Sequence, residues 1–132
     1  MAGRLRIAGV RLERGPGRVS VTVSLGHDGA VITGRADRAG GEVQTVPIAA
    51  EAALNAVRQV APGRARWGLE QAMVQPLAGG QAVVVHILLE TEEGASEHLI
   101  GSALGRRGPL EEAAAEAVLD AVERRLSGLV KN

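Results

Sequence analysis

The stretch AEAVLDAV, residues 115–122, is nearly a copy of AEAALNAV, residues 50–57. Six of the eight positions are identical, and the two copies lie about half a chain apart in a sequence of 132 residues. Apolar residues recur in both copies every three or four positions, which is typical of a helix that buries one face. We therefore interpret the chain as two copies of one folding unit, each ending in this helix.

The two helices have the same distribution of apolar and polar positions. Val57 and Val122 occupy matching positions on the apolar stripes, and Asn55 and Asp120 occupy matching positions on the opposite faces. This pattern predicts that the two valines are buried and that the two polar residues face solvent. Pro109 stands where the second helix begins, a position at which its fixed φ favours the first turn.

Three strand-like segments precede each helix. RVSVTVSL, residues 18–25, alternates apolar and polar residues, whereas AVVVHILLE, residues 82–90, is apolar on both faces. Gly9 interrupts the alternation of the first strand, which predicts a bulge there. Aligning the two central strands by their apolar positions matches Val19 with Val83 and Val23 with Ile87. The expected strands are 4–13, 18–25 and 30–37, followed by 67–77, 82–90 and 97–104.

This order of elements predicts an α+β fold made of a tandem pair of β-β-β-α units, with antiparallel sheets and two helices. One such unit is too small to close a core alone, so the two units are expected to share one core. The chain is then a single domain, 1–132, composed of a first unit, 4–63, and a second unit, 66–130. Because residues 82–90 are apolar on both faces, we expect that strand to be covered on both sides.

The composition disfavours several classes of function. Fifteen basic residues balance fifteen acidic ones, so no net field attracts nucleic acid or an anionic membrane surface. The chain has no cysteine, which excludes disulfides and thiolate chemistry. No apolar run is long enough to span a membrane, and the N-terminal residues do not resemble a signal peptide. We expect a cytoplasmic protein with no nucleic-acid and no membrane partner.

No recognisable catalytic, metal or cofactor motif is present. The three histidines, His27, His86 and His98, do not have the spacing of metal ligands. No serine lies in a nucleophile-elbow motif. The acid pairs Glu92-Glu93 and Glu111-Glu112 fit a solvated loop and a helix start. We therefore expect no catalytic residues, no metal and no cofactor, and a protein that is not an enzyme.

Two short motifs in the second unit carry a resemblance to a known family. GPLEEA, residues 108–113, and LDAVER, residues 119–124, resemble the helix-entry and helix motifs of the C-terminal regulatory domain of 2-isopropylmalate synthase. The order of elements is similar over nearly the whole chain, without the catalytic barrel of the synthase. The glycine-proline-acid motif matches in the second unit, and the first unit has no Asp in the corresponding loop. The resemblance implies a non-catalytic module that forms homodimers and binds a small metabolite near the helix starts.

Glycine-rich loops precede both helices. Exposed backbone N–H groups at a helix N-terminus bind anions, and adjacent arginines add charge-assisted hydrogen bonds. These loops are the candidate site for a small anionic metabolite. The alternatives are a purely structural or protein-interaction domain, in which the glycines only form turns, and an enzyme of an unrecognised type. The candidate ligand-binding residues are Gly40, Gly41, Gly105, Arg106, Arg107 and Gly108.

Trp67 is the only aromatic residue of the chain. Two interpretations are open for it. It closes the edge of the core, or it anchors a partner surface, as exposed aromatic residues often do.

Overall fold

The computed structural model describes residues 5–40, 44–61, 65–105 and 108–130. It confirms an α+β fold of two consecutive β-β-β-α units. The first unit contains β1 (Arg6–Gly15), β2 (Arg18–His27), β3 (Ala30–Ala39) and α1 (Thr45–Val60). The second contains β4 (Arg66–Leu77), β5 (Gly80–Glu90), β6 (Ser96–Gly105) and α2 (Leu110–Val130).

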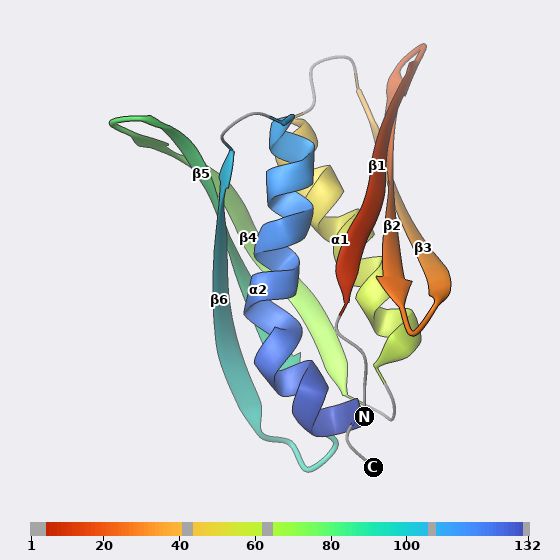
Figure 1. The fold of residues 1–132 in the computed structure, drawn as a ribbon, viewed down its shortest axis with the longest axis vertical. Helices are drawn as coiled ribbons and strands as arrows, with labels where there is room; N and C mark the ends of the chain where they lie inside the picture. The colour runs from red at the N-terminus through yellow and green to blue at the C-terminus, as the bar shows by residue number, and fades with distance from the viewer. Residues whose placement is uncertain (1–4, 41–43, 62–64, 106–107, 131–132) are drawn as a thin grey trace.

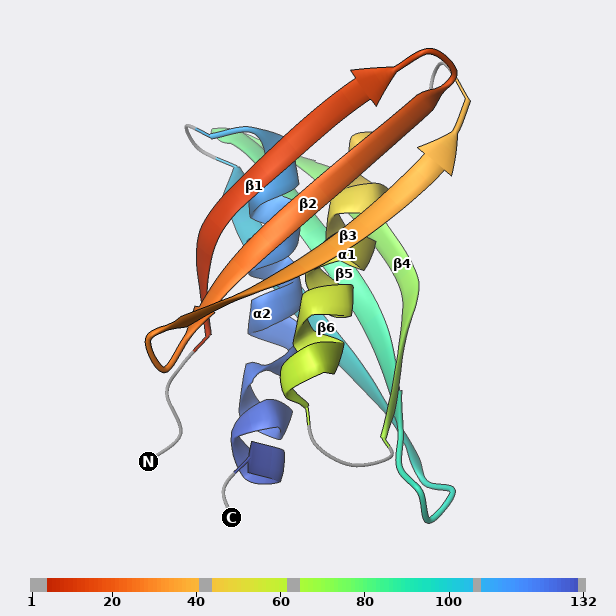
Figure 2. The same cartoon turned by 90° about the vertical axis from the view of Figure 1, so that its right-hand side faces the viewer.

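The two helices form a layer between two antiparallel sheets. Sheet A has the order β1-β2-β3 and sheet B the order β4-β5-β6. Figures 1 and 2 show the sheets on opposite sides of the helix pair. Helix α1 packs on β2 and β3 but also contacts β4, and α2 packs on β5 and β6 but also contacts β1. Each helix therefore touches the first strand of the other unit, so the two units share their interior.

One apolar cluster fills the space between the sheets. The inward-facing valines and leucines of β2 and β5 meet the apolar stripes of both helices there. Val57 and Val122 are both 0 % exposed, which confirms the prediction that matching positions of the repeated helix are buried. Trp67 is 4 % exposed and belongs to the same cluster, so it lies in the core and not on a partner surface.

Two glycines allow the helices to approach the sheets closely. A Cβ atom added to Gly34 on β3 would lie 2.9 Å from Cα of Ala56 and closer still to the carbonyl oxygen of Ala52. A Cβ atom added to Gly101 on β6 would lie 2.7 Å from Cβ of Ala121, with the same close approach to a helix carbonyl. Ala56 and Ala121 are matching positions of the repeated helix, so the two units use the same contact.

The strand register corrects the alignment of the central strands. Gly34 lies opposite Val23, and Gly101 lies opposite Val85. Because the two glycines make equivalent helix contacts, Val23 corresponds to Val85 and not to Ile87. The predicted alignment is therefore wrong by two positions, which is one full period of a strand.

Two bulges agree with the corrected alignment. The register of β1 on β2 shifts between Ile7 and Gly9, which confirms the predicted bulge. The register of β4 on β5 shifts between Leu69 and Gln71, which are the positions that match Ile7 and Gly9 once Val23 is aligned with Val85. The two bulges bend the first strand of each sheet at equivalent points.

Asp120 is exposed, as predicted, and Asn55 is half-buried, and both side chains also make hydrogen bonds to the strand next to their helix. The side-chain amide of Asn55 donates a hydrogen bond to the carbonyl oxygen of Arg35 at 2.8 Å. The backbone N–H of Ser102 donates one to the carboxylate of Asp120 at 3.0 Å. Arg35 and Ser102 lie on the outer strands β3 and β6, whose outer edges have no partner strand among the described elements. Each helix therefore supplies a polar side chain to the free edge of its own sheet.

The expectation that residues 82–90 are covered on both sides is also wrong for the single chain. The helices cover one face of β5, where Val83, Val85 and Ile87 are 0 % exposed. The other face, with Val84 and Leu88, points away from the helices and is only partly buried. No described element of the chain packs over it, which makes this face a candidate interaction surface.

Candidate functional site

The two helices begin side by side at one end of the helix layer (Figure 1). The hydroxyl of Thr45, in the first turn of α1, donates a hydrogen bond to the carboxylate of Glu111 in the first turn of α2. Strands β3 and β6 end at the same end of the molecule. The fold thus brings both helix entries together, as a shared ligand site requires.

Three of the six predicted ligand-binding residues are described, and two of them, Gly40 and Gly105, have a structural role. The N–H of Gly40 donates to the carbonyl oxygen of Gly17 at 2.8 Å and so belongs to the neighbouring turn. Gly105 is packed so closely that an added Cβ would lie 2.9 Å from a methyl group of Leu110. Gly108 is exposed, next to the carboxylate of Glu112. The remaining three lie outside the described residues: Gly41, Arg106 and Arg107.

Acidic side chains already occupy the surroundings of the helix starts. Glu111 and Glu112 lie in the first turn of α2, and Glu111 reaches the start of α1 through Thr45. The N-terminal ends of helices favour negative charge, and these carboxylates supply it. An anionic ligand binding here would meet two like charges, which opposes its binding.

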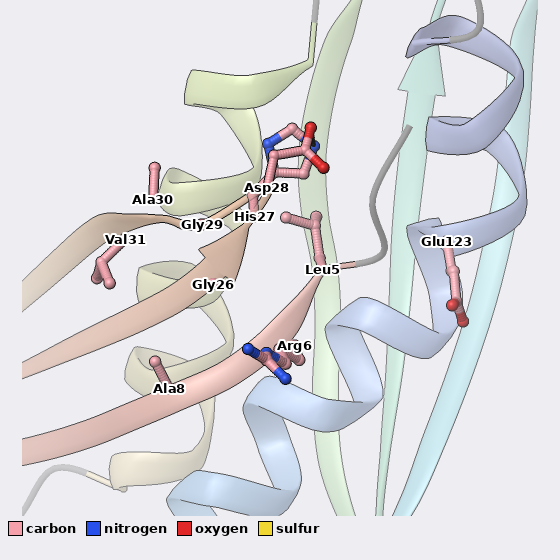
Figure 3. Close-up of a pocket in the computed structure, with 10 residues that line it drawn as sticks. All are labelled: Leu5, Arg6, Ala8, Gly26, His27, Asp28, Gly29, Ala30, Val31 and Glu123. Carbon is pink, nitrogen blue, oxygen red and sulfur yellow. Dashed lines mark ion pairs between the residues drawn. The ribbon is translucent and has the colours of Figure 1, made fainter. Parts of the chain in front are cut away.

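A cavity of about 680 Å³ lies at the other end of the molecule, where β1 begins and β2 turns into β3 (Figure 3). Its polar lining groups are Arg6, His27, Asp28 and Glu123, and no hydroxyl or thiol is among its described lining residues. His27 lies 3.5 Å from Asp28. Asp28 and Gly29 have φ values of 51° and 81°, which a two-residue type I′ hairpin turn requires. The turn accounts for His27 and Asp28, and the described lining residues offer no hydroxyl or thiol nucleophile.

The position of Glu123 in this cavity has a counterpart in the other unit. Glu123 on α2 matches Arg58 on α1 when the two copies of the repeated helix are aligned. Arg58 donates through Nε to the carbonyl oxygen of Trp67 at 3.2 Å, where β4 begins. Glu123 correspondingly lines the cavity at the start of β1. Both residues lie where one unit contacts the first strand of the other, which suits a role in joining the units.

The face of sheet B that points away from the helices is largely apolar. The register places Met73 and Ser102 on either side of Val84, and Gln71 and Ile100 on either side of His86. Ile100 is 63 % exposed. The outer apolar face, as we name it, consists of Met73, Leu77, Val84, Leu88, Ile100 and Leu104.

The corresponding face of sheet A is polar and charged. Thr22 lies between Arg11 and Arg35 in the register, and Ser20 lies between Glu13 and Asp37. The guanidinium of Arg35 pairs with Asp37 at 3.1 Å and covers Ser20. The two sheets are built from equivalent strands, yet only sheet B presents an apolar outer surface. Large exposed apolar surfaces on a folded chain mark interaction sites.

Two histidines meet on the outer side of sheet B. His86 Nε2 lies 2.7 Å from His98 Nδ1, and the ring centroids are 4.9 Å apart. No sequence pattern indicates this pair, because the two residues are twelve positions apart and form no ligand motif. Pairing of β5 with β6 makes them diagonal neighbours, since His86 lies opposite Ile100 and His98 lies opposite Leu88. The register of the hairpin is the signal that would have revealed them.

Comparison with known proteins gives no functional assignment. No protein-family model matches the chain, and a search of curated proteins finds no match. Within the described ranges, no helix is long and apolar enough to cross a membrane.

Proposed function

We propose that this chain is a non-catalytic module that forms a homodimer through the outer apolar face of sheet B. The observation that carries the proposal is the contrast between the two sheets. Equivalent strands present charged residues on sheet A and apolar residues on sheet B, where Ile100 is 63 % exposed. An apolar face that the chain leaves uncovered is stabilised when a partner removes it from water.

The size of this face suits a small dimer interface. The strands of sheet B contain 10 to 12 residues. Three strands about 4.8 Å apart, with about ten residues at about 3.3 Å each, cover roughly 500 Å². Two such faces in contact bury about 1,000 Å² if each is treated as flat, and protruding side chains add to this area. The total reaches the lower bound of about 1,000 Å² of buried surface for specific interfaces.

The chemistry of the face favours a second copy of the same chain. Its polar members at the centre are Gln71, His86, His98 and Ser102, each of which both donates and accepts hydrogen bonds. A twofold axis places such groups against their own kind without bringing like charges together. A strongly charged partner would find no complementary charge at the centre of this face.

The test replaces Ile100 with lysine and compares it with Val31→Lys. Val31 is 65 % exposed and lies on the outer side of sheet A, so it is a matched control. Light scattering after gel filtration at micromolar concentration should give twice the 13.6 kDa chain mass for the wild type and for Val31→Lys. Ile100→Lys should be monomeric because it buries a charge in the interface. A monomeric wild type, or an Ile100→Lys variant that stays dimeric, would contradict the proposal.

A second candidate function is the binding of a small anionic metabolite at the helix entries. The hydrogen bond between Thr45 and Glu111 supports it, because the entries of both helices are adjacent. The resemblance to the regulatory domain of 2-isopropylmalate synthase points to the same location. The nearby carboxylates oppose it, so we rank it below dimerisation.

Thermal unfolding in the presence of amino acids and 2-oxo acids tests this second function. A ligand present at 100 times its Kd stabilises the native state by about 2.7 kcal/mol. The double change Arg106→Glu and Arg107→Glu should abolish that stabilisation while leaving the melting temperature without ligand nearly unchanged. If no compound raises the melting temperature, the alternative of a structural or protein-interaction domain without a small ligand is favoured.

A further inference from the structure

We infer that His86 and His98 form half of a site for a divalent transition-metal ion, and that a second copy of the chain supplies the other half. The inference deepens the proposed function and rests on it, because it uses the same outer apolar face as the contact between two copies. The metal site depends on the two histidines of this face, whereas the proposed dimer depends on its apolar side chains.

The two ring nitrogens lie within hydrogen-bond distance of each other on the outer side of sheet B. His86 presents Nε2 from β5 and His98 presents Nδ1 from β6, and these atoms are 2.7 Å apart. A zinc ion bonds to imidazole nitrogen at about 2.0–2.1 Å, so two nitrogens on a tetrahedral ion are about 3.3 Å apart. The nitrogens need to separate by only about 0.6 Å, which small rotations of two partly exposed side chains supply. The ion then replaces the hydrogen bond between the two rings.

One chain cannot complete such a site. Among the described residues, no group of three or more His, Cys, Asp or Glu side chains is arranged to hold a metal ion. Structural zinc sites have four protein ligands. His86 lies on the central strand of sheet B, near the middle of the face. A twofold axis passing beside it brings two histidine pairs together and provides four nitrogens.

The imidazole ligands and their uncharged neighbours indicate which class of metal ion fits the site. The cross-strand neighbours of the two histidines are Gln71, Ile100 and Leu88, none of which is charged. Neutral imidazole ligands suit zinc, copper, nickel and cobalt, whereas magnesium and calcium require oxygen ligands. The geometry therefore points to a tetrahedral zinc-type site buried between two copies.

The experiment titrates the full chain, first stripped with EDTA and then freed of it, with zinc chloride in a calorimeter. We expect one zinc ion per two chains. His86→Ala and His98→Ala should each weaken binding by about tenfold or more, and His27→Ala, which changes the one other histidine, should leave it unchanged. Cobalt chloride serves as an optical probe, because tetrahedral Co²⁺ absorbs visible light much more strongly than octahedral Co²⁺. This spectrum is read on the wild type and does not depend on the folding of any variant.

Several results would overturn the inference: no saturable zinc binding, one zinc per chain without a change in mass, or an equal loss of affinity in His27→Ala. Light scattering in EDTA distinguishes failure of the metal site from failure of the proposed dimer. A protein that is dimeric in EDTA and binds no zinc refutes the metal site and leaves the apolar dimer standing. A protein that is monomeric in EDTA and dimerises with half an equivalent of zinc supports the metal site and refutes the metal-independent dimer.

Discussion

Replacing Gly34 or Gly101 with alanine should destabilise the protein severely, and to a similar extent at both sites. An added Cβ would lie 2.9 Å from Cα of Ala56 in the first unit and 2.7 Å from Cβ of Ala121 in the second. Carbon atoms pack best at about 3.5–4.0 Å, so the helix and the sheet must separate by about 1 Å. The obstructing atoms include helix backbone, which cannot rotate away as a flexible side chain does.

The expected cost follows from the packing that this separation loosens. A buried leucine makes about 40–60 contacts worth about 0.1–0.2 kcal/mol each, and a gap of about 0.5–1 Å forfeits a quarter to a half of that attraction. Each large side chain beside the contact therefore loses about 1–6 kcal/mol. Allowing for partial relaxation, we expect a loss of about 3–5 kcal/mol in the free energy of unfolding for each variant. That is a large part of the roughly 5–15 kcal/mol that stabilises a typical domain.

Urea unfolding followed by the fluorescence of Trp67 measures this loss. Trp67 is the only aromatic residue and is 4 % exposed, so its emission reports exposure of the core. Gly15→Ala and Gly79→Ala are the controls, because an added Cβ meets nothing within 4 Å at either site. They should stay within about 0.5 kcal/mol of the wild type at the same protein concentration. A cost below about 1 kcal/mol at both glycines would refute the close approach, and a cost at only one would refute the equivalence of the two units.

Two further predictions test the repeated helices. Val57→Ala and Val122→Ala should each lower the free energy of unfolding by about 1–3 kcal/mol, because both side chains are 0 % exposed. Urea unfolding measures the loss, and a neutral result at one site would show that the two helices are not equivalent. Asn55→Ala and Asp120→Ala should each lower the free energy of unfolding by about 0.5–1 kcal/mol, because each removes a hydrogen bond to the edge of a sheet. No change in urea unfolding would mean that hydrogen bonds to solvent replace these bonds without loss of stability.

Much of the fold could be predicted from local patterns in the sequence. The apolar period of about 3.6 residues located both helices, and the alternation of period two located all six strands within a few residues. Gly9 predicted the bulge in β1 correctly, because a single residue out of phase must be absorbed locally. These features depend on residues that are close in the chain, so the sequence contains the information needed to find them.

The correspondence between the central strands could not be decided in this way. Shifting one strand against another by two positions returns every side chain to the same face, so matching Val23 with Val85 or with Ile87 buries equally apolar sets. The structure selects Val85 because Gly34 and Gly101 must lie where the helices approach most closely. The roles of Asn55 and Asp120 were missed for a related reason, since their partners are strand edges in another part of the unit.

For the candidate sites too, some features follow from the sequence and others only from the folded chain. The order of residues was enough to show that the chain has two similar units, that glycines precede both helices and that β5 is apolar on both faces. Only the folded chain shows that both helices lie on one side of β5 (Figure 1). It also shows that the helix starts meet through Thr45 and Glu111, and that His86 and His98 are in contact. An apolar residue indicates a preference for being buried, but the element that covers it is set by the packing of segments that are distant in the chain.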